Sequence, residues 1–227
     1  MQVRDTGGEI DYLTFVPDGE PTLDKNLGIE IMMLKQLMIS IAVITVDAVS
    51  QEIWRKIDRS FKSLDLTKIL EGIKKFSTEF KGVLISETML VNNIEYGGEV
   101  EKIAVYLSSL KNLKTSYISI PTRPPAEEWA KPPEEEILNE AFQIFENKLK
   151  DRVEYLIGYE GNAFAYSGNI EEDLLSITAV HPMREEAVKE LLEKDRGDLS
   201  KIETLIKKGA IRKVNYQGHT YYLRKFR

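Results

Sequence analysis

Polar residues at the ends of apolar segments are the groups of this chain that could do chemistry. Gly19, Glu20 and Pro21 follow the apolar segment 10–16. Parallel sheets and barrels bind ligands in the loops at the carboxyl ends of their strands. The triplet therefore predicts a ligand-binding loop that offers a carboxylate and backbone groups. The alternative is an ordinary strand-to-helix turn with Asp24 or Asn26 as the helix cap.

Two carboxylates fall inside segments that read as strands. Glu87 lies in the segment 83–90, and Asp47 lies in the segment 39–48. A carboxylate in a buried strand must be paired or must line a cavity, because an unpaired buried charge is costly. Inward residues near the end of a barrel strand reach the active site. Both residues thus predict either a pocket role or a structural salt bridge.

Two later loops carry further candidate binding residues. Arg123 lies in a proline-rich loop after the segment 116–120, and a guanidinium there can hold an anion or a carboxylate. A solvated loop arginine is the alternative. Tyr159, Glu160 and Asn162 cluster after the last apolar segment, where they predict substrate contacts or a tight turn.

Composition excludes several kinds of site. The 227 residues include no cysteine and two histidines, which excludes disulfides and thiolate metal sites and argues against a zinc site built from histidine. No metal-binding residue is therefore predicted. No apolar run reaches the roughly 18–20 residues that span a bilayer, and the first residues lack the apolar core of a signal peptide. We expect a cytoplasmic protein without a membrane partner.

The spacing of apolar residues predicts an α/β domain with a parallel sheet. Strand-like segments alternate with segments that place apolar residues at helical spacing, as β/α units do. The predicted strands are 10–16, 39–48, 83–90, 116–120 and 153–159, and the predicted helices are 27–37, 51–60, 66–80, 100–110 and 134–149.

The segment 40–50 does not fit this alternation. It reads as two strand-like pieces that meet at Thr45 and Val46 with nothing between them. Parallel neighbours need a crossover of a dozen or more residues. One hypothesis is that a helix and part of a strand, on the order of 20–25 residues, are missing at this junction. The alternative is one long strand with a bend.

The last part of the chain predicts a small α+β unit. Two helices at 181–192 and 199–208 precede a hairpin at 211–224 that turns at Gln217 and Gly218. Residues 181–227 hold 12 Lys and Arg against 7 Asp and Glu, whereas the whole chain has a net charge of −6. The pattern resembles a winged-helix module, whose basic hairpin would face nucleic acid or, alternatively, another protein. The predicted contact residues are Arg212, Lys213, Arg224 and Lys225. The predicted domains are 1–176 and 177–227.

Several of these segments together resemble a known family. The segments 11–24, 46–59, 87–91, 118–125 and 155–162 are similar to radical S-adenosylmethionine (SAM) proteins of the wyosine-tRNA-synthase-like group. The resemblance implies a partial (β/α)6 barrel, a 4Fe–4S cluster, SAM and an electron donor. It also implies formation of a 5′-deoxyadenosyl radical, with tRNA base modification as the expected activity. The residues implied to bind SAM are Gly19, Glu20, Pro21, Thr45, Asp47 and Glu87.

One departure from the family decides what this chain can do alone. The family holds its cluster on three cysteines spaced C-x-x-x-C-x-x-C, and this chain has none. Without them the chain is expected to be inactive in radical chemistry. We expect the cluster-binding β/α unit to be missing from this sequence. The alternative is a catalytically inactive barrel that acts as a nucleic-acid- or protein-binding module through its winged helix.

Overall fold

The computed structural model describes residues 41–158, 167–180, 182–195 and 197–225. These residues divide into two compact units. The first unit contains the described residues up to Pro121 and residues 127–157, and the second contains residues 122–126 and the described residues from Gly158 onward. Each unit has its own apolar core.

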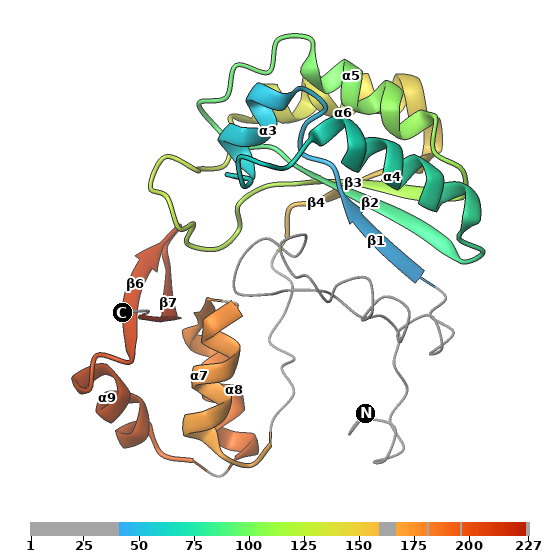
Figure 1. Cartoon of the computed structure of the whole chain (residues 1–227). Helices are drawn as coiled ribbons and strands as arrows, with labels where there is room; N and C mark the ends of the chain where they lie inside the picture. Colours follow the sequence, from blue (N-terminus) through green and yellow to red (C-terminus); the bar gives the residue numbers. More distant parts are fainter. Residues whose placement is uncertain (1–40, 159–166, 181, 196, 226–227) are drawn as a thin grey trace. The chain divides into compact units, whose positions relative to one another are not determined.

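The first unit is a parallel four-stranded sheet with helices. The strands follow the order β1-β2-β3-β4, and every neighbouring pair is parallel. All the described helices of this unit lie on one face of the sheet (Figure 1). The strands are β1 (Ile41–Thr45), β2 (Val83–Met89), β3 (Leu113–Ser119) and β4 (Val153–Leu156); the helices are α3 (Gln51–Ile57), α4 (Leu66–Glu79), α5 (Glu99–Ser108), α6 (Glu135–Leu149) and the short 3-10 turn η2 (Lys150–Arg152).

Alternation along the strands separates the two faces of the sheet. In β2, Leu84, Ser86 and Thr88 are buried, whereas Val83, Ile85, Glu87 and Met89 are only partly buried. The buried set points toward the helices, where it joins the core that includes Ile103, Leu107, Ile118 and Phe145. Successive strand residues point to opposite faces. Glu87 therefore points to the face that the described helices leave uncovered, and we call this face the open face.

The predicted parallel α/β architecture is confirmed in the described part of the first unit. The predicted strands at 83–90, 116–120 and 153–159 correspond to β2, β3 and β4, and the predicted helices at 66–80, 100–110 and 134–149 correspond to α4, α5 and α6. The predicted strand 10–16 and helix 27–37 lie outside the described residues. Closure of the strands into a partial (β/α)6 barrel stays a prediction.

The segment 40–50 contains one strand where two pieces were predicted. β1 ends at Thr45, and the residues from Val46 to Ser50 form a loop that enters α3. The loop leaves the sheet after Val46, whose amide donates to the Glu87 carbonyl at 2.9 Å. The interpretation of 46–49 as the start of another strand is thus wrong for this structure, in which α3 and α4 form the crossover from β1 to β2.

The second unit packs helices against a small antiparallel sheet of order β5-β7-β6. Its elements are α7 (Ile170–Val180), β5 (Met183–Arg184), α8 (Glu185–Lys194), α9 (Leu199–Lys207), β6 (Ile211–Tyr216) and β7 (His219–Arg224). The predicted hairpin is confirmed: Gln217 and Gly218 both have positive φ, 47° and 75°, as a two-residue hairpin turn requires.

Two elements of the second unit differ from the sequence-based prediction. The helix predicted from residue 181 begins only at Glu185, because Met183 and Arg184 pair with Tyr222 and Tyr221 as β5. The helix α7 was not predicted, and it spans the boundary that we predicted between residues 176 and 177. Its residues Ile170 and Leu174 are buried in the core of the second unit.

Candidate functional site

A row of four polar side chains crosses the open face near the carboxyl ends of the strands. Thr45 of β1 is level with Glu87 of β2, Glu87 is level with Tyr117 of β3, and Tyr117 is level with Glu154 of β4. Residues that are level in neighbouring parallel strands point to the same face. The four side chains therefore form one continuous row, which we call the polar row.

Hydrogen bonding links two members of the polar row. The Tyr117 hydroxyl is hydrogen-bonded to the Glu154 side chain. Burial raises the pKa of Tyr117, and the charge and hydrogen bond of Glu154 raise it further. Tyr117 therefore stays protonated at neutral pH and donates a hydrogen bond to the carboxylate.

The polar row suits ligands that carry positive charge or hydroxyl groups. Adjacent strands lie about 4.8 Å apart, so Glu87 and Glu154, two strands apart, are separated by roughly 10 Å at the backbone. Carboxylates accept hydrogen bonds from ammonium groups and hydroxyls, and charge-assisted bonds of this kind are the stronger ones. A polyphosphate would be repelled by the same two carboxylates.

Asp47 has a different environment from Glu87. Its side chain is 4% exposed, and its Oδ1 accepts a hydrogen bond from the Met89 amide at 2.7 Å. Burial raises the pKa of Asp47 well above its usual value, and the neighbouring Asp58 adds to this effect. Asp47 thus holds a proton over a wider pH range than a surface aspartate and braces the end of β1 against β2.

A cavity of about 370 Å³ adjoins this aspartate. Asp47 and Asp58 are the acidic residues of its lining, which is otherwise mostly apolar. The apolar part comes mainly from α3 and α4 and includes Trp54, Leu66, Ile69, Leu70 and Ile73. The predicted ligand-binding role of Asp47 stays a prediction, and in this structure the carboxyl group has intramolecular partners.

Glu99 is a buried acidic residue that our sequence-based reasoning did not identify. It is 1% exposed, and its Oε1 accepts hydrogen bonds from the amides of Val49 at 2.7 Å and Ser50 at 2.5 Å. These bonds fix the loop that leads from β1 to α3. The partners lie 50 and 49 residues away in the sequence, so no local pattern could have indicated them.

Most of the remaining predicted ligand-binding residues lie outside the part of the chain that the structure describes. Gly19, Glu20, Pro21, Tyr159, Glu160 and Asn162 lie outside the described residues. Arg123 is partly buried and belongs to the second unit, in the loop 122–126. The Thr122 carbonyl of this loop accepts a hydrogen bond from the Tyr221 hydroxyl at 3.0 Å.

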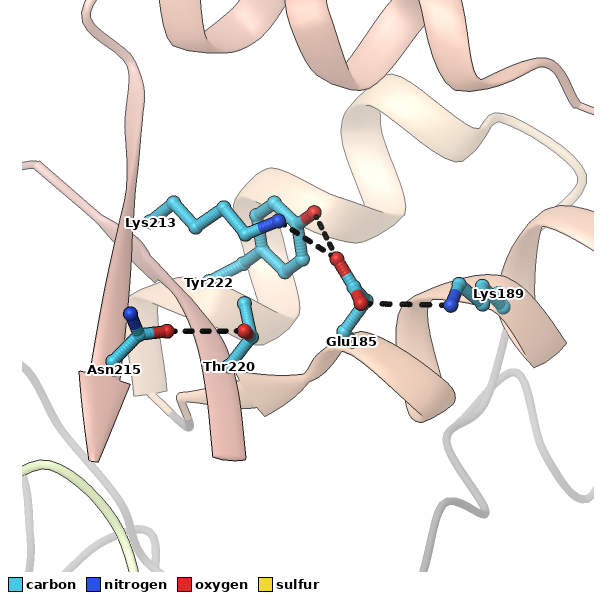
Figure 2. A network of polar contacts seen from close by, with 6 residues as sticks. All are labelled: Glu185, Lys189, Lys213, Asn215, Thr220 and Tyr222. Atoms are coloured by element: carbon cyan, nitrogen blue, oxygen red, sulfur yellow. Dashed lines mark hydrogen bonds and ion pairs between the residues drawn. The ribbon is translucent and has the colours of Figure 1, made fainter. Parts of the chain in front are cut away.

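Two of the four residues predicted to contact nucleic acid have local partners in the second unit. Lys213 Nζ lies 2.8 Å from Glu185 Oε1, which also accepts from the Tyr222 hydroxyl at 3.2 Å (Figure 2). Arg224 donates to the Leu175 carbonyl at 2.9 Å. The side chains of Arg212 and Lys225 are exposed.

The residues present do not fit a 4Fe–4S cluster. Such clusters are held by cysteine thiolates, and the sequence has no cysteine. In the part of the chain that the structure describes, no group of three His, Cys, Asp or Glu residues could hold a metal ion. A carboxylate such as Glu87, with hydroxyls beside it, can accept hydrogen bonds from a ligand that carries an ammonium group and a ribose. Among the described helices, none is long and apolar enough to cross a membrane.

Comparison with known proteins identifies close sequence relatives. No protein-family model matches the chain. The chain is 42% identical, over 241 aligned positions, to a UPF0026 protein of Methanocaldococcus jannaschii; the match covers 95% of this chain and 75% of that protein. It is 29% identical over 142 residues to a UPF0026 protein of Synechocystis, and this match covers 51% of the chain and 52% of that protein.

Solved structures provide a comparison of folds. A radical SAM methyltransferase from Sphaerobacter thermophilus superposes with a TM-score of 0.51 at 12% identity, over 70% of this chain and 54% of that one. A domain of pyruvate-formate lyase-activating enzyme from Bacteroides vulgatus has a TM-score of 0.42 at 15% identity, over 60% of this chain and 75% of that one. The first match shows a shared fold.

Proposed function

This chain belongs to the UPF0026 protein family, and we propose that the whole protein is a radical SAM enzyme. In this proposal the first unit supplies the face that binds SAM. The observation that carries it is the polar row, which lies near the carboxyl ends of parallel strands and on the face that the described helices leave uncovered. Parallel sheets and barrels bind ligands at that end of their strands.

Glu87 is the residue of the described chain that we assign to SAM. It is partly exposed on the open face, and the hydroxyl-bearing Thr45 is level with it on the neighbouring strand. A carboxylate in this position can accept hydrogen bonds from the ammonium group of SAM, with Thr45 beside it for a ribose or carboxylate group. Gly19, Glu20 and Pro21 are proposed to complete the site.

The cluster requires residues that this sequence does not contain. We propose that the three cysteines belong to a part of the protein outside the 227 residues. The Methanocaldococcus relative, of which this chain matches 75%, is long enough to hold such a part. When bound, the cluster would supply the electron for cleavage of SAM, and no residue described here takes part in that step.

The second unit is proposed to be a winged-helix-like module that brings tRNA to the enzyme. Its order of elements supports this proposal, since a helix, a short strand, two helices and a hairpin follow one another. Arg212 and Lys225 are exposed cations on or beside the hairpin. Modification of a tRNA base is the reaction that we propose.

Binding of SAM to the full-length protein tests the principal proposal. Titration calorimetry under anaerobic conditions should show binding to the natural protein and an affinity at least about tenfold lower for Glu87→Gln. A lost hydrogen bond to a charged group costs about 1.5–3 kcal/mol, and 1.4 kcal/mol corresponds to a factor of ten.

Glu140→Gln is the matched control, because Glu140 is an exposed glutamate of α6 on the helical side of the sheet. It should bind SAM as the natural protein does. Absence of SAM binding to the natural protein, or equal affinity of the Glu87→Gln variant, would contradict the proposal.

A further inference from the structure

The far end of the polar row has features of a second binding site. Tyr117 and Glu154 lie one and two strands away from Glu87, and the Tyr117 hydroxyl is hydrogen-bonded to Glu154. This interaction places a protonated donor beside the Glu154 carboxylate. Among the described residues Glu154 has no further hydrogen-bond or ion-pair partner, so its remaining lone pairs can accept hydrogen bonds from a ligand.

The charge of the open face favours a positively charged group. Glu87 and Glu154 are the charged residues among the described, paired strand positions on this face, and none of those positions holds Lys or Arg. The neighbouring polar positions, Thr45, Thr115 and Ser119, carry hydroxyls. The paired positions thus offer hydrogen-bond acceptors and negative charge without a cation of their own to neutralise it.

A buried hydroxyl provides independent support. Ser119 is 4% exposed, and its Oγ has no hydrogen-bond partner among the described residues. It follows Tyr117 by two positions in β3, and it is level with Met89 and Leu156 on the neighbouring strands, so it points to the same open face. A buried polar group without a partner is unfavourable, because it has lost its hydrogen bonds to water, and a bound ligand could restore such a bond.

We propose that Tyr117, Ser119 and Glu154 form a substrate subsite for a primary or secondary ammonium group. The subsite lies roughly 10 Å from Glu87 along the polar row, as the spacing of strands requires. Glu154 accepts the ammonium protons, Tyr117 orients the carboxylate, and Ser119 accepts or donates one further hydrogen bond. The inference rests on the proposed function, because it places the substrate on the face assigned to SAM.

The experiment uses n-butylamine and its neutral analogue 1-butanol as probes. Each is titrated against the full-length protein by nuclear magnetic resonance at fixed ionic strength, in parallel with SAM. Butylamine should bind at least tenfold more tightly than butanol. Glu154→Gln should reduce the butylamine affinity about tenfold while changing the SAM affinity less than twofold, and Glu87→Gln should show the opposite preference.

Two further variants distinguish the effect of the Tyr117 hydroxyl on amine binding from the effect of the protein's net negative charge. Tyr117→Phe keeps the ring and removes only the donor, so it should weaken butylamine binding about threefold and leave the fold intact. Glu140→Gln should change neither affinity, which controls for general attraction between the amine and an acidic protein.

The results of these titrations distinguish this inference from the proposed function. The proposed subsite would be refuted if butylamine and butanol bound with equal affinity. It would also be refuted if Glu154→Gln and Glu140→Gln lost equal butylamine affinity. Equal losses of SAM affinity and butylamine affinity in Glu154→Gln would refute it as well, since both ligands would then occupy one shared site. Selective amine binding in a protein that fails to bind SAM would support the subsite and refute the proposed function.

Discussion

At the scale of single residues, the environment gives different roles to carboxyl groups that look alike in the sequence. Asp47 and Glu87 both fall in strand-like segments, so the sequence predicts the same two alternatives for both, a pocket role or a structural salt bridge. In the structure Glu87 points to the open face, whereas Asp47 is buried, accepts a hydrogen bond from Met89 and neighbours Asp58. Burial favours the protonated form of Asp47, because desolvation penalises the charge.

The raised pKa of Asp47 predicts how stability depends on pH. In the native state its pKa is higher than in the unfolded chain, so the native state binds the proton more tightly. The stabilisation from this group is complete below about pH 4 and is lost as the pH rises through the native pKa. The side chain introduced by Asp47→Asn cannot ionise. The free energy of unfolding of this variant should therefore fall less than that of the natural protein between acidic and neutral pH.

Urea unfolding of the full-length protein between pH 4 and 8 checks this prediction. Asp151→Asn, at an exposed aspartate of η2, should keep the pH dependence of the natural protein. If Asp47→Asn kept that dependence as well, Asp47 would be ionised in the native state and the interpretation of its burial would be wrong.

At the scale of elements, the connection from β1 to α3 depends on partners that are distant in sequence. The Thr88 hydroxyl donates to the Val46 carbonyl at 2.9 Å, and Glu99 accepts from the amides of Val49 and Ser50. These bonds satisfy backbone groups that the loop would otherwise leave buried without partners. The loop is therefore held by β2 and α5 rather than by its own turn residues.

Removal of the Glu99 side chain should destabilise the protein. Glu99→Ala leaves two partly buried amides without an acceptor, and we expect a loss of about 2–4 kcal/mol in the free energy of unfolding, since a buried group without a partner costs about 1–3 kcal/mol. Glu101→Ala is the control on the same helix. Glu101 forms an exposed ion pair with Lys148 at 2.9 Å, which is worth about 1 kcal/mol at most.

Chemical denaturation of both variants measures the difference. Losses of similar size in Glu99→Ala and Glu101→Ala would show that the two hydrogen bonds of Glu99 contribute little to stability. A large loss in Glu99→Ala alone would establish that α5 fixes the entrance to α3.

At the scale of the whole molecule, charge is divided unevenly along the chain. Residues 181–227 carry 12 basic and 7 acidic residues, whereas the remainder carries 19 basic and 30 acidic residues. Some of these basic residues are paired locally, because Lys213 forms an ion pair with Glu185 and Lys208 forms one with Glu171. Arg212 and Lys225 are thus the better candidates of the predicted set for contacts with a phosphate backbone.

The proposed tRNA contact predicts a salt-dependent interaction. The double variant Arg212→Ala/Lys225→Ala should bind tRNA more weakly, and the slope of log affinity against log salt should decrease by about 1–2, since each phosphate contact of a lysine or arginine contributes roughly 0.7–0.9 to that slope. Filter binding at several salt concentrations gives both quantities.

Lys68→Ala/Lys81→Ala, two exposed lysines of the first unit, is the matched control for charge. It should retain the affinity and slope of the natural protein. If both double variants lost affinity equally, the interaction would reflect net charge and the hairpin would have no special role.

The sequence by itself determined the elements that depend on neighbouring residues. Strand-like segments between helical ones predicted β2 and β3, the spacing of apolar residues predicted α4, α5 and α6, and Gln217 with Gly218 predicted the turn of the hairpin. These features depend on side chains within one or two turns or on the local backbone preference of glycine. Only the tertiary structure decided which polar residues meet. Tyr117 and Glu154 were invisible as site residues, because their alignment with Glu87 depends on strand register across segments that are distant in the sequence.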